Sequence, residues 1–559
     1  MNRRIACCAI LSAIVIIFDA VCVASAGLVS ASDSSYPKTT ASGISLAITI
    51  NDWDQPAVLA QTDPVAVSVS LNPGSYLGEA ADWWMLAETQ SGDFYYLSSN
   101  YTWVGPVPLS QVHPALQGGL FPLSEVKLLQ VTGLQPGVYR FYFGVDEMNG
   151  VIDPDVVYTY ADLAVVLPTN SAETDTGTGT LRKEGALWIL NLQGDYFDMG
   201  RQYGYLVKNQ LLAAYAVLDR DIKFDNPSVQ AILSQTETII DDRERLLLYG
   251  MSQQTGLTFK QHQFIGFALF FSYFQECSVF GATRTQTTTG YTLTGHNYDN
   301  PTAEMNQFAG RSAVIVYNPV DETHNNHADN QVAVVTSLGW FFGPSVMNNK
   351  GLQFKYLNGM ISVTTPDLTI PDGLHQNLYA ALDCDTEAEV DARYMNAKVA
   401  VATLSQVCNE TNVWHYERSP LENSMKLLAG QATGAQYYAN QTNEDLFTNH
   451  FFLTNHVGQS FRYTSPANDS GSRSFQRLVN LQTLAQQHVG SVSVAALKQI
   501  MTTKFADGGT YWDPFTSGTD DQNVFVCITD VKNRIINVFP SCERERASWV
   551  ELDLKQEYR

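Results

Sequence analysis

One cysteine is the residue best placed by its sequence context to do covalent chemistry. The chain has eight cysteines, and Cys7, Cys8 and Cys22 lie in an apolar N-terminal stretch typical of a removable export signal. Five remain, and an odd number leaves one thiol unpaired in an oxidising compartment. Because the other four lie late in the chain, Cys277 is the candidate. The count alone is equally compatible with Cys277 being a small buried hydrophobe.

The neighbours of Cys277 determine what kind of nucleophile it can be. The stretch "ECSVFGATRTQTTTGYTLTGHNYDNP" starts at Glu276, and its Thr-Gly turn predicts a hairpin that brings Asp299 back beside the cysteine. Two nearby carboxylates raise the pKa of a thiol, so the thiol needs a separate base. Cleavage before Cys277 supplies one, because an α-amino group has a pKa of about 7.7–8.0. We therefore expect a precursor cut between Glu276 and Cys277, with Asp299 orienting the new ammonium.

The remaining four cysteines are expected to form two disulfides. Four thiols allow three connectivities. Proximity in sequence favours Cys384–Cys408, which leaves Cys527–Cys542 by exclusion. The second pair fits less easily, because "NVFVCITDVKNRIINVF" predicts a hairpin in which Cys542 lies beyond the residue facing Cys527.

The N-terminus indicates where the protein acts. Two arginines precede the apolar run "IACCAILSAIVIIF", and a small-x-small site at Ala24-Ser25-Ala26 predicts a signal peptide over residues 1–26. No later run reaches the 18 or so apolar residues of a membrane span. We expect a secreted or periplasmic protein, or a luminal one in a eukaryote.

The charge balance disfavours two classes of partner. The chain has 33 basic and 56 acidic residues, a net charge of −23. Non-specific binding to nucleic acid or to an anionic membrane depends on Lys and Arg, so neither is expected. Acidity of this kind is typical of proteins that are soluble outside the cell.

We expect no cofactor and no metal.

Turns and periodicity divide the 559 residues. From 42 to 168, short β-branched or alternating runs are separated by Pro- and Gly-containing turns, which predicts a small β-sandwich. Residues 169–184 begin with the small, polar "TNSAETDTGTGT" and are predicted to be a linker. From 185 to 559, strands and helices come in blocks, which favours α+β layers. One of the helices starts at a capping box of Thr386 and Glu389.

Five motifs give the region from Leu187 onwards a specific resemblance. "GDYFDMGRQYGYLV" opens a helix with spaced glycines, and "CSVFGATRTQTTTGYTLTGHNYD" is a hairpin ending in a Gly-x-Asn-x-Asp turn. "MNNKGLQFKYLNG" is a strand pair, "FLTNHVGQSFR" contains Thr-Asn-His, and "SFQRL" contains Ser-x-x-Arg. In this order they resemble the peptidase C45 family, the relatives of acyl-coenzyme A:6-aminopenicillanic acid acyltransferase. That family belongs to the N-terminal nucleophile hydrolases, together with the more distant choloylglycine hydrolases.

The resemblance implies an αββα sandwich, preceded here by the β-sandwich. It implies that Cys277 is the nucleophile and, through its α-amino group, the base, and that Asp299 supports the amine. Asn358 matches an oxyanion-hole asparagine, Asn455 fits the asparagine that binds the acyl carbonyl or its oxyanion, and Arg477 fits the family arginine near the site. Taken alone, the two asparagines are also compatible with ordinary hydrogen bonding at strand ends, and the arginine with a salt bridge on a helix surface.

These assignments predict a secreted amidohydrolase that acts on small N-acylated compounds through a thioester acyl-enzyme. An N-acyl amino acid, a lactone or a penicillin-like amide fits. Water is favoured as acceptor, because acyl-coenzyme A is an intracellular donor. The two chains made by cleavage are expected to stay associated, because the strand beginning at Cys277 should lie inside a sheet.

Three alternatives remain open at the level of sequence. They are an acyltransferase of the penicillin-forming type, a phospholipase B-like lipid hydrolase, and a non-catalytic surface-binding protein. Two departures bear on them. Glu276 replaces the small glycine that precedes the nucleophile in penicillin-forming members, and His296 stands where the bile-salt branch has arginine, so that branch's substrate is not carried over.

Overall fold

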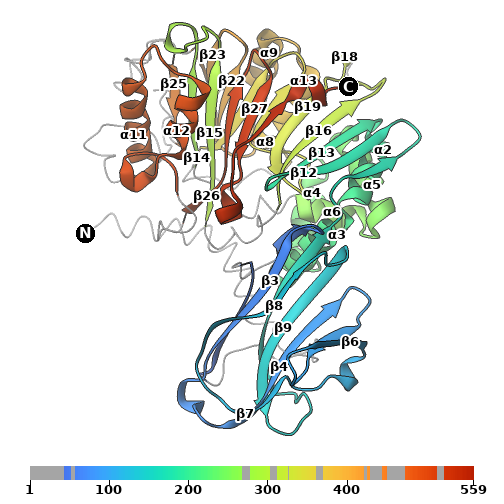
Figure 1. Ribbon diagram of the computed structural model, residues 1–559. Helices are drawn as coiled ribbons and strands as arrows, with labels where there is room; N and C mark the ends of the chain where they lie inside the picture. The colour runs from blue at the N-terminus through green and yellow to red at the C-terminus, as the bar shows by residue number, and fades with distance from the viewer. Residues whose placement is uncertain are drawn as a thin grey trace. The chain divides into compact units, whose positions relative to one another are not determined.

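The computed structural model forms two compact units (Figure 1). One unit runs to Val165 and includes Asp225–Gln230, and the other comprises Val166–Phe224 and Ala231–Arg559. The residues described are 43–51, 57–266, 277–301, 311–324, 327–359, 369–420, 425–428, 444–449, 472–512 and 521–559. The predicted signal peptide lies outside these residues.

The first unit consists of two β-sheets. A three-stranded sheet has the order β1-β3-β8, and a seven-stranded sheet has the order β2-β10-β9-β4-β5-β6, with β7 paired to β4. The strands are β1 (Ser45–Ile50), β2 (Ala57–Ala60), β3 (Pro64–Asn72), β4 (Ala80–Thr89), β5 (Phe94–Leu97), β6 (Trp103–Val107), β7 (Leu116–Gly119), β8 (Leu123–Thr132), β9 (Gly137–Glu147) and β10 (Val157–Val166).

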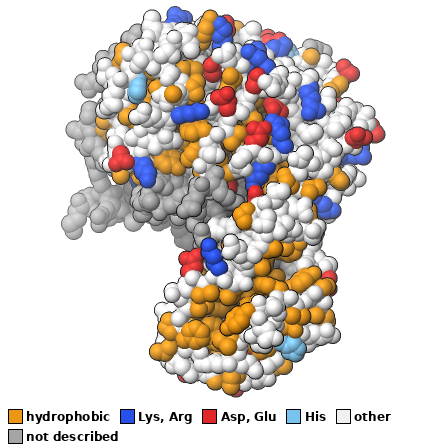
Figure 2. Space-filling model, viewed as in Figure 1, with side chains coloured by type: hydrophobic (Ala, Val, Ile, Leu, Met, Phe, Trp, Pro, Cys, Tyr) orange, Lys and Arg blue, Asp and Glu red, His pale blue; other side chains and the backbone are white. Residues whose placement is uncertain are grey.

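Alternation along the strands builds the core of this unit. Successive residues of a strand face opposite sides, and in β3 this places Val65, Val67 and Val69 in a buried cluster that also holds Trp83 and Phe143. The rings of Trp83 and Phe143 lie 6.4 Å apart. Figure 2 shows hydrophobic side chains gathered on one face of the unit as well.

Residues 169–184 form two strands, so the predicted linker was wrong. β11 (Asn170–Glu173) and β12 (Thr178–Glu184) pair antiparallel at the edge of a ten-stranded sheet in the second unit. Gly179 is small because a helix packs there: a Cβ would lie 2.7 Å from Cβ of Gln202. The small, polar composition thus reflects an edge strand under a closely packed helix.

The ten-stranded sheet has the order β11-β12-β13-β16-β19-β20-β21-β22-β23-β24. Within it, β13 and β16 run parallel, and the other neighbouring pairs in the described segments run antiparallel. The remaining strands are β13 (Leu187–Gly194), β16 (Ser312–Pro319), β19 (Val332–Ser337), β20 (Ser345–Asn348), β21 (Gln353–Asn358), β22 (Thr403–Cys408), β23 (Val413–Arg418) and β24 (Met425–Leu428).

A six-stranded sheet has the order β25-β14-β15-β26-β27-β28 and runs antiparallel. Its strands are β14 (Cys277–Ala282), β15 (Leu293–Pro301), β25 (Glu444–Phe447), β26 (Asp521–Asp530), β27 (Ile535–Phe539) and β28 (Val550–Asp553). This sheet faces the ten-stranded one. The Thr294 hydroxyl donates to Gln353 Oε1 at 2.7 Å, and His296 Nδ1 lies 2.8 Å from Ser345 Oγ.

Helices cover the outer faces of these two sheets. Residues of β15 alternate, so that Gly295 and Asn297 face α12 (Val494–Thr502): Asn297 donates to the Met501 carbonyl at 2.9 Å. On the other sheet, a Cβ at Gly373 of α8 (Gly373–Asp383) would lie 2.6 Å from the Tyr356 ring. The layers of this unit are therefore helix, sheet, sheet and helix.

The remaining helices lie beside these layers.

The predicted capping box of Thr386 and Glu389 is present at the start of α9 (Glu387–Asn396), which confirms that prediction. The bounds are α8 (Gly373–Asp383), α9 (Glu387–Asn396), α11 (Arg473–Gln487), α2 (Tyr196–Leu206), α3 (Lys208–Asp221), α4 (Pro227–Thr236), α5 (Asp242–Thr255), α6 (Phe259–Gly266) and α13 (Leu554–Glu557); two short strands, β17 (Thr323–His324) and β18 (His327–Ala328), form a ribbon.

The spaced glycines of the first motif have a packing reason. Gly200 and Gly204 lie one turn apart on α2, on the face that meets α5. A Cβ at Gly200 would lie 2.1 Å from the Leu247 carbonyl oxygen, and one at Gly204 2.7 Å from that of Met251. Only glycine permits the two backbones to approach so closely.

The five cysteines after the predicted signal peptide are all buried thiols, and none of them forms a disulfide: Cys277, Cys384, Cys408, Cys527 and Cys542. The predicted pairs Cys384–Cys408 and Cys527–Cys542 are therefore not present. Cys527 lies within β26 opposite Val538, and Cys542 lies 3.2 Å from the Ser312 hydroxyl. As expected from the hairpin, the residue that faces Cys527 is Val538, and Cys542 lies further along the chain, after β27 has ended.

None of the helices in the described segments is both long and apolar enough to cross a membrane.

Candidate active site

Cys277 is the first residue of β14, a strand that has β25 on one side and β15 on the other. Its side chain is completely buried. β14 and β15 form the hairpin predicted from the Thr-Gly turn, with Cys277 opposite Tyr298. Tyr298 and His296 share a strand face, and His296 faces the ten-stranded sheet. The Cys277 thiol therefore belongs to the layer between the sheets.

Asp299 follows directly, at an irregularity of the strand. The register of β15 against β26 shifts between Tyr298 and Asp299, and a bulge of this kind re-aims the next side chain. One carboxylate oxygen, Oδ1, accepts from Asn523 Nδ2 at 2.8 Å, and Asn523 in turn accepts from the Ser541 hydroxyl at 2.8 Å. The carboxylate is thus fixed from the side of β26.

Arg477 joins the nucleophile strand to this carboxylate. Its Nη1 donates to the Cys277 carbonyl at 2.9 Å and to Asp299 Oδ2 at 3.1 Å. Its Nη2 donates to the side-chain carbonyl of Asn449 at 3.0 Å. Arg477 and Asp299 are both fully buried, so the ion pair is shielded from water, where charge-assisted hydrogen bonds are strong.

The Ser-x-x-Arg element lies in the first turns of helix α11. Ser474 and Arg477 are three residues apart and lie on one face of the helix. The backbone N–H of Asn449 donates to Ser474 Oγ at 3.0 Å, and the Thr448 hydroxyl donates to the Ser474 carbonyl at 2.8 Å. The serine fixes the segment after β25, and the arginine reaches past it to the nucleophile strand.

Asn449 is the site residue that the sequence analysis missed. Its Oδ1 accepts the backbone N–H of Cys277 at 2.8 Å, and its Nδ2 donates to the Asn358 backbone carbonyl at 2.8 Å. Thr448-Asn449 precedes His450 in a first Thr-Asn-His tripeptide, and Asn455 belongs to a second. Asn455 lies outside the described residues. The sequence does contain a signal for Asn449: the Thr-Asn-His tripeptide occurs twice, and its first copy directly follows the buried strand β25.

Asn358 lies at the end of β21, as its motif predicted. Its backbone carbonyl accepts from Asn449 Nδ2, which ties it to the cluster, and the residue is half-buried. The structure therefore brings Cys277, Asp299, Arg477 and the backbone of Asn358 together. Whether the Asn358 carboxamide donates to an oxyanion stays a prediction.

Between the sheets, burial suppresses the charge of other ionisable groups. Burial and the neighbouring Lys355 hold the pKa of His296 well below its usual value, so this histidine is neutral. Burial also lowers the pKa of Lys355 to about 8. A neutral imidazole offers no fixed cation to a substrate. In the part of the chain that the structure describes, no cluster of His, Cys, Asp and Glu is arranged to hold a metal.

Comparisons with known proteins add little to this geometry. No protein-family model and no curated protein matches the chain. One matching solved structure is the crystal structure of a mutant of conjugated bile acid hydrolase from Clostridium perfringens, at 12% identity and a TM-score of 0.32. The match covers 50% of this chain and 93% of that one. A TM-score this low does not define a shared fold, so the resemblance to the peptidase C45 family stays a prediction.

Proposed function

We propose that the protein is an exported cysteine N-terminal nucleophile amidohydrolase that acts on small N-acylated compounds. The observation that carries the proposal is the environment of the Cys277 backbone nitrogen. It donates to Asn449 Oδ1 at 2.8 Å, and the same residue's carbonyl accepts from Arg477, which pairs with Asp299. The helix–sheet–sheet–helix layers around β14 agree with the architecture of that superfamily.

A fixed acceptor beside this nitrogen suits an α-amino base. After cleavage before Cys277, the nitrogen becomes an amine whose pKa of about 7.7–8.0 allows it to gain and lose a proton near neutral pH. Asn449 Oδ1 accepts a hydrogen bond from the amine and directs its lone pair away from that oxygen. The Arg477–Asp299 ion pair holds the strand end in place, so that amine and thiol keep their relative positions.

The cleavage and the reaction on substrate use the same groups. In the precursor, the thiol attacks the Glu276 carbonyl, an N-to-S shift gives a thioester, and water releases the α-amine. On substrate, the amine takes the thiol proton and the sulfur attacks the acyl carbonyl. The leaving nitrogen takes the proton back, and water then hydrolyses the thioester. An asparagine donor at the oxyanion lowers the barrier by about 2.7–4 kcal/mol.

Hydrolysis is favoured over acyl transfer because the predicted export signal would separate the enzyme from acyl-coenzyme A. The first unit supplies none of the residues of the Cys277 cluster. We assign it a role in attachment to a surface or polymer, supported by its hydrophobic face and by exposed side chains such as Leu77, Tyr101 and Val151.

A thiol-reactive acyl probe tests the activity class. The purified mature protein should take up one acyl label at Cys277, located by peptide mass mapping, and a panel of N-acyl amino acids should be hydrolysed in preference to phospholipids. The variant Cys277→Ala should do neither. The matched control Cys384→Ala removes another buried thiol and should keep both. Release from phospholipids alone would replace the proposal by the lipid-hydrolase alternative.

A further inference from the structure

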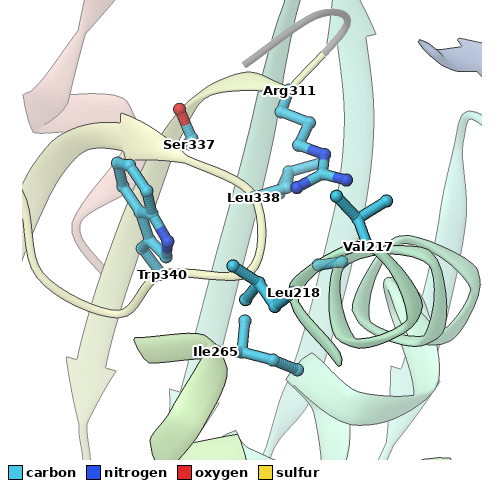
Figure 3. A pocket seen from close by; sticks show the side chains of 8 residues that line it. Val217, Leu218, Ile265, Arg311, Ser337, Leu338 and Trp340 are labelled. Atoms are coloured by element: carbon cyan, nitrogen blue, oxygen red, sulfur yellow. The ribbon is translucent and has the colours of Figure 1, made fainter. Parts of the chain in front are cut away.

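Arg311 and Asn300 both have buried polar atoms with no hydrogen-bond partner in the described segments, but they differ in what lies beside them. In Arg311 these atoms are Nε and Nη2, the side-on edge of the guanidinium. Arg311 lines a small cavity together with Ser337, whose hydroxyl has no partner in those segments either (Figure 3). The cavity volume is about 10 Å³, which is room for roughly one water molecule. This place is therefore too small for a larger ligand.

Asn300 lies on the strand that pairs with the nucleophile strand. Cys277, the first residue of β14, is opposite Tyr298 of β15. Residues 299–301 of β15 extend past the start of β14 and still pair with β26. Alternation along the strand places Asn300 on the same face as Tyr298, which is the face turned toward the ten-stranded sheet. Asn300 therefore lies in the layer that holds the Cys277 thiol, just beyond the first residue of β14.

The Asn300 carboxamide is fully buried and only partly hydrogen-bonded. Its Nδ2 donates to the Tyr298 hydroxyl across 3.5 Å, a long hydrogen bond. Its Oδ1 has no partner among the residues described, and leaving a buried carbonyl oxygen without a donor is costly. The Tyr298 ring stacks on Phe525 with the ring centroids 5.2 Å apart, so the group that orients Asn300 is itself held in place. Cys277 is as completely buried as Asn300, so burial does not separate the two.

The position of this oxygen indicates which part of a substrate it meets. In the proposed cleavage, the thiol attacks the carbonyl of the residue before Cys277. The acyl group that is transferred to sulfur therefore comes from the side of β14 into which β15 extends, and the acyl group of a later substrate takes the same place. A carbonyl oxygen accepts hydrogen bonds and cannot donate them. Asn300 Oδ1 is thus matched by a donor on the acyl group, and a plain alkyl chain leaves it unpaired.

We propose that Asn300 is a specificity-determining residue, which accepts a hydrogen bond from an amide N–H on the acyl side of the substrate. An amide is the donor of choice because the precursor presents a peptide at this place. The preferred substrates are then amides whose acyl group is an N-acylated amino acid, and simple fatty acyl amides are disfavoured. This inference rests on the proposed function and narrows its substrate class.

Two anilides with p-nitroaniline as the common leaving group test the inference. Their acyl groups, N-acetylglycyl and acetoxyacetyl, have the same length and differ only in the replacement of an N–H by an oxygen atom. For each anilide, kcat/KM is divided by the rate constant of its hydrolysis by hydroxide, which removes the difference in intrinsic reactivity. In the wild-type mature protein, the normalised value should be at least about fivefold higher for the N–H compound, the low end for a buried acceptor left unpaired.

Two variants locate the origin of this preference. Asn300→Leu removes the acceptor at similar size, so the ratio of the two normalised values should fall to about one. The control Asn297→Ala removes a carboxamide from the opposite face of β15, where it donates to the Met501 carbonyl, and should keep the wild-type ratio. A merely structural role of Asn300 would lower both values together and leave the ratio unchanged.

The outcomes separate this inference from the function on which it rests. Equal normalised values for the two anilides in wild type would overturn the inference and leave the proposed amidohydrolase in place, because both compounds are still hydrolysed. An undiminished ratio in Asn300→Leu would overturn it as well. Hydrolysis of neither anilide would overturn the proposed function, and the inference with it. The wild-type comparison stays decisive if Asn300→Leu does not fold.

Discussion

Two buried arginines of the second unit differ in whether a counter-charge lies beside the guanidinium. Arg477 is fully buried and places its terminal nitrogens on the Asp299 carboxylate, the Cys277 carbonyl and Asn449. Arg311 is nearly as buried, but its side-on edge has no partner among the described residues. Since a buried cation is stabilising only with its counter-charge, the first arginine organises the fold around a site, whereas the second lies beside a cavity with room for about one water molecule.

The largest expected effect is on stability. Arg477→Met leaves the Asp299 carboxylate buried without its cation, and breaking a buried pair in this way costs about 3–5 kcal/mol. Arg311→Met removes a charge that has no partner in the described residues, so it should leave the free energy of unfolding unchanged or raise it. Urea unfolding followed by circular dichroism measures both.

A second variant checks the reason for that difference. Arg477→Met combined with Asp299→Asn removes both charges and should recover part of the loss. Equal destabilisation by Arg477→Met and Arg311→Met would show that the contrast between the two arginines is not one of charge pairing.

The repeated tripeptide offers a matched pair of variants for turnover. Asn449→Ala removes the acceptor at the Cys277 nitrogen, so we expect a fall in kcat of about 10²–10³-fold, as large as that for the loss of one oxyanion-hole donor. Asn455→Ala tests the other asparagine separately: its predicted contact with the acyl carbonyl or its oxyanion also predicts a fall in kcat. Normal turnover of Asn449→Ala would leave Asn449 a structural residue, and normal turnover of Asn455→Ala would remove Asn455 from the predicted site.

Asn358→Ala separates a side-chain role from a backbone role. The backbone carbonyl that accepts from Asn449 is kept in this variant, so the fold should be intact. If the carboxamide is the oxyanion donor, kcat should fall by about 10²–10³-fold with little change in KM. Normal turnover would mean that Asn358 contributes only its carbonyl to the cluster.

The smallest effect is expected on removing the first unit. A chain starting at Val166 keeps β11 and the complete ten-stranded sheet. It should retain most activity on a small soluble substrate, because the Cys277 cluster lies entirely in the second unit. Loss of activity in a truncated chain that is folded by circular dichroism would show that the first unit takes part in catalysis.

The sequence predicted the features that depend on local patterns. Turn, capping and glycine patterns specify three of these features. They are the hairpin from Cys277 to Asp299, the capping box of Thr386, and the spaced glycines Gly200 and Gly204. These features therefore appear where they were expected.

The features that depend on tertiary contacts were harder to predict. Residues 169–184 look like a linker in composition, but hydrogen bonding to a neighbouring strand makes them a sheet edge. The four late cysteines are close in sequence, yet strand register keeps Cys527 opposite Val538. Asn449 and Asn455 share one tripeptide, and packing against Ser474 of α11, which no local pattern reveals, brings Asn449 to the site.

The central claim is that Cys277 becomes an N-terminus. Intact mass and N-terminal sequencing of the active preparation measure this directly. We predict two associated chains, Gly27–Glu276 and Cys277–Arg559, and a single inactive chain for Cys277→Ala. An active preparation that contains only the uncut chain would remove the α-amino base and contradict the account.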